Sequence, residues 1–287
     1  MSDAIDEARE EAGRPAALSR AARGLLGAAA AAYVVIGLPL FLAPEWASEH
    51  FAWTVSPFVA MTAGGWCLGT AAFAGYATAR PRWTSARPTV VYVLAFGASQ
   101  LGVALYERER LRAGEVLTWP YLVALGLSVV AGALALAQGH RHLRADRRPG
   151  RDLPSNMRRL RVAFVALVFF LALVAFVAPT RATNGAIFPE PLSLFSLRAF
   201  GVFYLSLGVG MLAVVGDRHA DGYLVYMRAG LILVVPILVA TAVYAGSFDL
   251  GEHPLQVVYP LAYVVALVGA AGALRWERRG TPVSGRT

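Results

Sequence analysis

The chain has 287 residues, of which 57% are hydrophobic and only 15% are charged, and its net charge is +8. A soluble domain carries about 25% charged residues, so this composition excludes an ordinary soluble protein and favours a chain embedded in a lipid bilayer. All 26 basic residues are arginine, which excludes a Schiff-base lysine and a lysine nucleophile.

The N-terminal segment 1–21 is polar and of mixed charge, and its acidic start predicts a cytoplasmic tail rather than a signal peptide. Eight apolar segments follow, at 23–43, 56–78, 88–106, 119–138, 160–178, 194–215, 228–248 and 256–275. Each is long enough to cross a hydrocarbon core of about 30 Å at about 1.5 Å per residue. Because backbone amides have no water partner inside a bilayer, these segments are expected to be helices. We therefore predict an all-α transmembrane bundle of eight helices.

The arginines predict the orientation of the chain. If the N-terminus lies inside and the helices alternate, 21 of the 26 arginines fall on the inner side. This positive-inside asymmetry predicts that both the N- and C-termini are cytoplasmic. It also makes membrane lipids the expected partners, with anionic headgroups at the cytoplasmic face, and argues against nucleic acid. We expect a multi-pass protein of a bacterial cell membrane, and the sequence leaves open a protein partner or a homo-oligomer.

The eight segments repeat as two sets of four. The recurring positions are Leu42-Ala43-Pro44 with Val177-Ala178-Pro179, Ser56, Phe58, Gly64 and Leu68 with Ser193, Phe195, Gly201 and Leu205, and Trp119-Pro120 with Tyr259-Pro260. An even number of spans gives both halves the same orientation, which predicts two parallel four-helix repeats. The expected organisation is a tail at 1–21, a first repeat at 22–139, a basic cytoplasmic linker at 140–158, a second repeat at 159–276 and a tail at 277–287.

Proline and glycine positions predict local helix geometry. Pro236 lies in the middle of the seventh segment and is expected to kink that helix. Glycines recur at helical spacing, and we expect them to let helices approach closely rather than to bind a ligand. They are Gly65 and Gly69, Gly126 and Gly132, Gly201 and Gly208, and Gly269 and Gly272.

A few polar residues within or beside the helices are candidates for ligand binding. Arg198 is the ionisable residue best placed inside a span, and it is either an interfacial anchor, a partner for Glu107 or Asp249, or a contact for an anionic ligand. Gln100 is an amide deep in the third helix, where a hydrogen bond between helices is a simpler role than substrate binding. Tyr204 is a further polar group of the same kind.

The sequence predicts no catalytic residue, no cofactor and no metal. It contains no Walker A motif, no nucleophile elbow and no pair of intramembrane carboxylates. None of the histidines falls at mid-membrane depth, which argues against haem ligation. A surface metal site combining His50 and Glu49 with His253 and Glu252 lacks ligand spacing. The single Cys67 is expected to be a buried, inert thiol.

Aromatic residues are expected to mark the two membrane interfaces, with Trp46, Trp53, Trp119 and Tyr259 outside and Trp83 and Trp276 inside. The stretch Phe51-Ala52-Trp53-Thr54-Val55-Ser56-Pro57 before Ala63-Gly64-Gly65-Trp66 resembles multi-pass membrane proteins of high-GC actinobacteria that carry a FAWT-x-x-P loop. That family has no assigned function, so the resemblance implies no site residue. The loop itself is expected to lie along the outer interface.

Three functional classes follow from these observations. The first is a non-enzymatic accessory, structural, or lipid- or ligand-binding membrane protein, favoured because buried charge and catalytic motifs are scarce. The second is a small passive transporter or channel with a site between the repeats, lined by Gln100, Arg198 and Tyr204 near Pro236. The third is an outer-face enzyme acting on lipid through Glu107, Asp249, His50 or His253.

Overall fold

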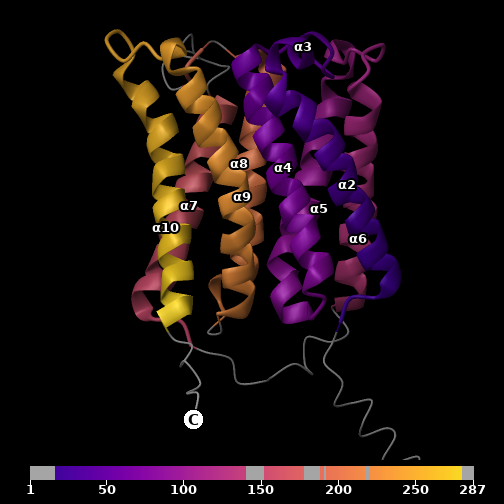
Figure 1. The fold of residues 1–287 in the computed structure, drawn as a ribbon, viewed down its shortest axis with the longest axis vertical. Helices are drawn as coiled ribbons and strands as arrows, with labels where there is room; N and C mark the ends of the chain where they lie inside the picture. The colour runs from indigo at the N-terminus through magenta and orange to yellow at the C-terminus, as the bar shows by residue number, and fades with distance from the viewer. Residues whose placement is uncertain (1–16, 140–151, 178–187, 191, 218–219, 280–287) are drawn as a thin grey trace, which may run out of the picture.

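The computed structural model describes residues 17–139, 152–177, 188–190, 192–217 and 220–279. Over these residues the chain is helical, without a β-sheet, and eight helices are long and apolar enough to cross a membrane. They lie side by side along the long axis of the molecule, and α2 begins at the same end of the bundle at which α10 ends (Figure 1). The expectation of an all-helical chain with eight helices of membrane-spanning length is therefore confirmed over the described residues. Most of the predicted tails and linker, together with His140 and His142, falls outside the described residues.

The helix boundaries agree with the apolar segments to within a few residues in most cases. The long helices are α2 (Arg20–Leu42), α4 (Pro57–Ala79), α5 (Trp83–Tyr106), α6 (Thr118–Gly139), α7 (Ser155–Val177), α8 (Leu194–Val215), α9 (Asp221–Val243) and α10 (Val258–Arg279). A short helix α3 (Pro44–Glu49) and three 3-10 turns, η1 (Arg108–Arg110), η5 (Ala245–Ser247) and η6 (Pro254–Val257), lie between them. Helix α7 begins inside the range 140–158 that was expected to be a linker.

Serine residues begin three of the long helices. The hydroxyl oxygens of Ser19, Ser56 and Ser193 each accept a hydrogen bond, at 3.2 Å, from a backbone amide in the first turn of the helix that follows. Such a side chain satisfies an amide that has no partner within its helix. Ser56 and Ser193 are one of the recurring pairs of the sequence, and they occupy the same capping position of α4 and α8.

Helices α2, α4, α5 and α6, here called the first half, lie beside helices α7 to α10, the second half (Figure 1). Within each half the first helix packs on the second and the third packs on the fourth. Between the halves α4 packs on α9 and α8 packs on α5, so the second helix of each half contacts the third helix of the other. The centre of the molecule is therefore built from α4, α5, α8 and α9.

Glycine permits the closest helix contacts. A Cβ atom at Gly64 would lie 2.7 Å from the backbone nitrogen of Phe41 on α2, and one at Gly69 would lie 2.4 Å from the Cβ of Leu233 on α9. Gly65 faces Pro236, and α9 continues as one helix through that proline. Gly126 and Gly272 were expected to pack closely and do not, because nothing lies within 4 Å of a Cβ built at either position.

Several aromatic residues that were expected at the membrane interfaces lie in the core instead. Trp53 is only 2% exposed, and Tyr259 and Trp83 are also buried, whereas Trp46 and Trp119 are exposed as predicted. The Trp53 ring stacks on Phe195 of α8 with the ring centroids 4.3 Å apart, and its Nε1 donates a hydrogen bond to Ser196 Oγ at 3.1 Å. The loop before α4 thus inserts between the halves and does not lie flat along the surface.

The two halves differ in how their outer helices meet. Helices α2 and α6 pack along one another, and Ser128 Oγ on α6 donates to the hydroxyl of Tyr33 on α2 at 3.0 Å. Helices α7 and α10 touch over only a few residues. The share of the apolar stretch that is buried is correspondingly 39% in α6 and 22% in α10. The second half is therefore open on the side where the first half is closed.

Candidate functional site

Gln100 joins three helices and has its hydrogen bonds satisfied within the protein. Its side-chain nitrogen donates to the backbone oxygen of Ala199 on α8 at 2.9 Å, and its side-chain oxygen accepts from the hydroxyl of Tyr121 on α6 at 3.3 Å. The side chain is buried. Gln100 therefore links helices by hydrogen bonds, as expected. The same hydrogen bonds engage the amide atoms that a ligand would need.

Arg198 forms an ion pair with Glu107, which was one of the two partners expected for it. Glu107 is 6% exposed and also pairs with Arg110, and the Arg198 guanidinium carbon lies 4.6 Å from the centroid of the Tyr106 ring. The pair connects the N-terminal part of α8 to the end of α5, so it links the two halves. A buried carboxylate held by two guanidinium groups is more easily explained as a structural contact than as a free ligand site.

Asp249 lies apart from this ion pair. Tyr244, and not Asp249, occupies the C-terminal capping position of α9 that corresponds to Glu107 in α5. The Asp249 carboxylate is exposed and accepts from the amide of Glu252 at 3.1 Å, within the turn before η6. It therefore organises its own loop.

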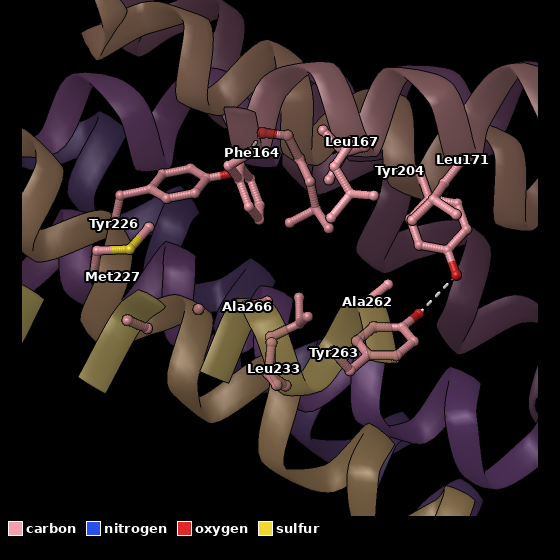
Figure 2. Close-up of a pocket in the computed structure, with 15 residues that line it drawn as sticks. Phe164, Leu167, Leu171, Tyr204, Tyr226, Met227, Leu233, Ala262, Tyr263 and Ala266 are labelled. Atoms are coloured by element: carbon pink, nitrogen blue, oxygen red, sulfur yellow. Dashed lines mark hydrogen bonds between the residues drawn. The ribbon is translucent and has the colours of Figure 1, made fainter. Parts of the chain in front are cut away.

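Tyr204 faces a cavity in the second half. Its hydroxyl lies 3.0 Å from the hydroxyl of Tyr263 on α10, and the two rings close one end of the cavity (Figure 2). Tyr226 and Met227 of α9 line the opposite end, and Phe164 and Leu167 of α7 line the wall between (Figure 2). Apart from the tyrosine hydroxyls, the side chains that line this cavity are apolar.

Two further cavities adjoin this one and lead to the surface between α7 and α10. The next cavity, of about 170 Å³, shares Phe164, Met227 and Ala270 with the first, and Arg161 forms part of its wall. The last is a surface groove of about 450 Å³ that shares Leu160, Gly269 and Val265 with the second. We call the three together the α7–α10 crevice. An engineered apolar cavity of roughly 150 Å³ takes up benzene, so the middle cavity alone is large enough for an apolar group.

The shape of the crevice follows from side-chain size. Its α10 wall carries small residues one turn apart, Ala262, Ala266 and Ala270, together with Gly269. A Cβ at Gly269 would meet only the end of the Leu160 side chain, at 3.5 Å. Small residues on α10 opposite large ones on α7 leave space, because α7 and α10 do not close on each other.

Arg161 lies at the end of the crevice nearest the start of α7. It is 1% exposed, its two terminal nitrogens donate to the backbone oxygens of Val214 and Asp217 at the end of α8, and its guanidinium carbon lies 5.6 Å from the centroid of the Tyr223 ring. The Asp217 carboxylate is bound by Arg87 of α5 at 2.6 Å. Arg161 is thus a charged side chain inside a span, and it is more deeply buried than Arg198.

Neither of the two histidines in the described part of the chain, His50 and His253, belongs to a cluster of three or more potential metal ligands. His50 Nδ1 lies 2.9 Å from the backbone oxygen of Trp46, on whose ring it stacks, and His253 is exposed in the turn before η6. Among the described residues, no three His, Cys, Asp or Glu side chains gather at one place. His219 and the remaining histidines lie outside the described part of the chain. Cys67 is buried, as expected.

The structure brings together residues that the sequence did not single out, and of the sequence candidates it joins Arg198 to Glu107. Gln100, Arg198 and Tyr204 contact different neighbours, and of the three only Tyr204 lines one of the cavities described above. The crevice residues Phe164, Met227 and Tyr263 carry no motif. Two features of the sequence could have pointed to the crevice. They are the alanines of α10 at intervals of one turn and the arginine within the apolar run of α7.

Comparison with known proteins supplies no relative from which a function could be carried over. No protein-family model, no curated protein and no solved structure matches this chain.

Proposed function

We propose that this protein is a non-enzymatic, multi-pass membrane protein that binds the hydrocarbon chain of a membrane lipid in the α7–α10 crevice. The observation that carries the proposal is the crevice itself, which is apolar, opens between two helices and reaches the interior of the second half. Helices α7 and α10 expose Phe170, Leu173 and Val268. Because such surfaces face lipid, a chain could enter sideways from the bilayer.

The proposal includes an internal duplication in which one copy of the closed four-helix unit has opened. The reciprocal contacts of α4 with α9 and α8 with α5, and the caps at Ser56 and Ser193, support a duplication about an axis along the bundle. When the two halves are aligned on the recurring Pro44 and Pro179, Tyr33 aligns with Val168. When they are aligned on Pro120 and Pro260, Ser128 aligns with Val268. Loss of that hydrogen-bonded pair is a physical reason for the second half to open.

The arginine distribution supports the orientation that this function needs. Arginines gather at the end of the bundle where α2 begins and α10 ends, here called the arginine-rich end; Arg23, Arg80, Arg158 and Arg278 are examples. We place this end in the cytoplasm of a bacterial cell. The groove of the crevice then opens in the cytoplasmic leaflet. Transport and enzyme chemistry are not proposed, because Gln100 and Arg198 hold structural contacts and of the three polar candidates only Tyr204 lines the crevice.

Photocrosslinking tests the proposal directly. The full-length protein in nanodiscs would receive a phosphatidylcholine with a diazirine near the end of one acyl chain, and labelled peptides would be mapped by mass spectrometry. We expect labels to concentrate on the crevice walls of α7 and α10. Replacing Gly269→Leu fills the groove, since only the flexible Leu160 lies near that position, and should reduce crevice labelling several-fold.

Gly126→Leu is the matched control, because position 126 also has open space and lies on α6 of the first half. It should leave crevice labelling unchanged. Labels spread evenly over all exposed helices, or crevice labelling that is unchanged in Gly269→Leu, would show that lipid does not occupy the crevice.

A further inference from the structure

The chemistry around Arg161 identifies the headgroup of the lipid. We infer that the α7–α10 crevice selects a lipid with an anionic phosphodiester headgroup, and that Arg161 is the residue that recognises the negative charge. This inference rests on the proposed function, because it assumes that the hydrocarbon chain of a lipid occupies the crevice. It adds to that function the chemical class of the lipid headgroup.

The hydrogen bonds of Arg161 leave part of its guanidinium group without a partner. The two terminal nitrogens donate to backbone oxygens at the end of α8, as expected for a cation that caps a helix C-terminus. The Nε atom, by contrast, is buried and makes no hydrogen bond. A guanidinium presents five N–H donors in a fixed plane, so the hydrogen bonds that cap α8 use only some of the donors of Arg161.

The charge balance near Arg161 also favours an anion. The Asp217 carboxylate is the acid beside Arg161, and Arg87 already holds it at 2.6 Å. Arg158 adds a further positive charge nearby. Arg161, which is 1% exposed, therefore has as its acidic neighbour among the described residues a carboxylate that Arg87 already holds. Unpaired charge is costly to bury, so a phosphodiester, which arginine binds in two-pronged geometry, would offset that cost.

The position of Arg161 fits a lipid that lies in the crevice. Arg161 belongs to the wall of the 170 Å³ cavity, and this cavity continues into the surface groove that has Asn156 and Met157 at its end. Asn156 lies in the first turn of α7, at the arginine-rich end. A lipid whose headgroup stays at this end can direct a chain past Phe164 toward the Tyr204–Tyr263 pair (Figure 2).

The experiment compares two lipids that differ only in headgroup. Phosphatidylglycerol and phosphatidylcholine with the same diazirine-bearing chain would be offered separately to the wild-type protein in nanodiscs of neutral lipid. We expect phosphatidylglycerol to label the crevice at least several-fold more than phosphatidylcholine. Unlabelled phosphatidylglycerol should compete, and inorganic phosphate alone should not.

Arg161→Gln should abolish the preference and retain labelling by phosphatidylcholine. Because this variant also loses contacts to α8, its folding would be checked by thermal unfolding, and Arg161→Lys, which keeps the charge, should retain much of the preference. Arg228→Gln is the control for removal of one arginine, since Arg228 pairs with Glu277 and lies outside the crevice walls.

The two proposals fail in different ways. Equal crevice labelling by both lipids in the wild-type protein overturns the headgroup inference and leaves chain binding intact. Absence of crevice labelling by both lipids overturns chain binding itself. Displacement by inorganic phosphate would show that Arg161 holds a free anion rather than a lipid headgroup.

Discussion

Trp53 Nε1 donates a hydrogen bond to Ser196 Oγ at 3.1 Å, and this contact ties the loop before α4 to the first turn of α8. Near it, the hydroxyl of Ser56 donates to the carboxylate of Glu190, so the segment before α8 reaches back to the cap of α4. The two halves are therefore joined at this end by contacts that each half makes to the other.

Replacing Trp53→Ala should destabilise the protein by about 3–5 kcal/mol, because a large buried aromatic side chain is lost and the halves no longer interlock. Trp53→Phe keeps most of the ring packing and should cost about 1 kcal/mol for the missing hydrogen bond. Unfolding in detergent micelles, followed by circular dichroism, measures both. The exposed Trp119→Ala serves as control and should cost less than about 1 kcal/mol.

Replacing Gln100→Leu should lower the free energy of unfolding by about 1–2 kcal/mol, since Ala199 and Tyr121 both lose a partner. Tyr121→Phe removes one of the two hydrogen bonds and should cost less. If the contacts act as described, the double variant will cost less than the sum of the single variants. Strict additivity in this cycle would contradict a coupling between Gln100 and Tyr121.

Arg198→Gln should destabilise the protein by about 1.5–3 kcal/mol, because it removes a charged hydrogen-bond partner from the buried Glu107. Arg110 also pairs with Glu107 but is half exposed, so Arg110→Gln should cost no more than about 1 kcal/mol. Chemical unfolding of both variants compares them. Adding Glu107→Gln to Arg198→Gln should recover part of the lost free energy of unfolding. A further large loss of stability in the double variant would argue against the ion pair.

Gly69→Ala should destabilise the contact between α4 and α9, because the new Cβ would overlap Leu233. Overpacking of this kind costs about 1–3 kcal/mol. Gly126→Ala meets open space and should be neutral or slightly stabilising. Thermal unfolding of the two variants under one set of conditions separates them, and equal melting temperatures would contradict the close approach.

Glu190 should make stability depend on pH. Burial raises the pKa of the Glu190 carboxyl above its usual value of 4.5, and the hydrogen bond from Ser56 lowers it by less. Because the folded protein then binds the proton more tightly than the unfolded chain, stability falls as pH rises from about 4.5 through the raised pKa. Melting temperatures from pH 4 to pH 8 measure this. Glu190→Gln should remove this contribution, and an identical pH profile in the variant would argue against it.

The sequence predicted the parts of the fold that depend on hydrophobicity and charge. The eight spans were predicted because apolar runs of membrane length leave little alternative, and Glu107 was found as a partner of Arg198 because few acids lie at that depth. Trp53 was misplaced, because an aromatic residue between two spans has the same pattern whether it faces lipid headgroups or enters the core. Only tertiary packing separates the two cases.

The crevice could not be predicted from the sequence for a related reason. Its walls consist of ordinary apolar residues, and its space depends on α7 and α10 touching over only a few residues as well as on the small side chains of α10. Arg161 follows Arg158 and Arg159 closely in the sequence, a pattern typical of the solvated inner end of a span. Its burial depends on α7 beginning at Ser155, several residues before the apolar run starts.

The closed contact between Tyr33 and Ser128 has a consequence for the stoichiometry of the lipid binding that we propose. A duplicated bundle with two open halves would offer two equivalent lipid-binding sites, and binding of lipid at one site would then be able to affect binding at the other. Under the proposed function, the described residues offer one such site, because the first half is closed by that hydrogen bond and the second half is open. Native mass spectrometry should accordingly find a stoichiometry of one retained lipid per chain.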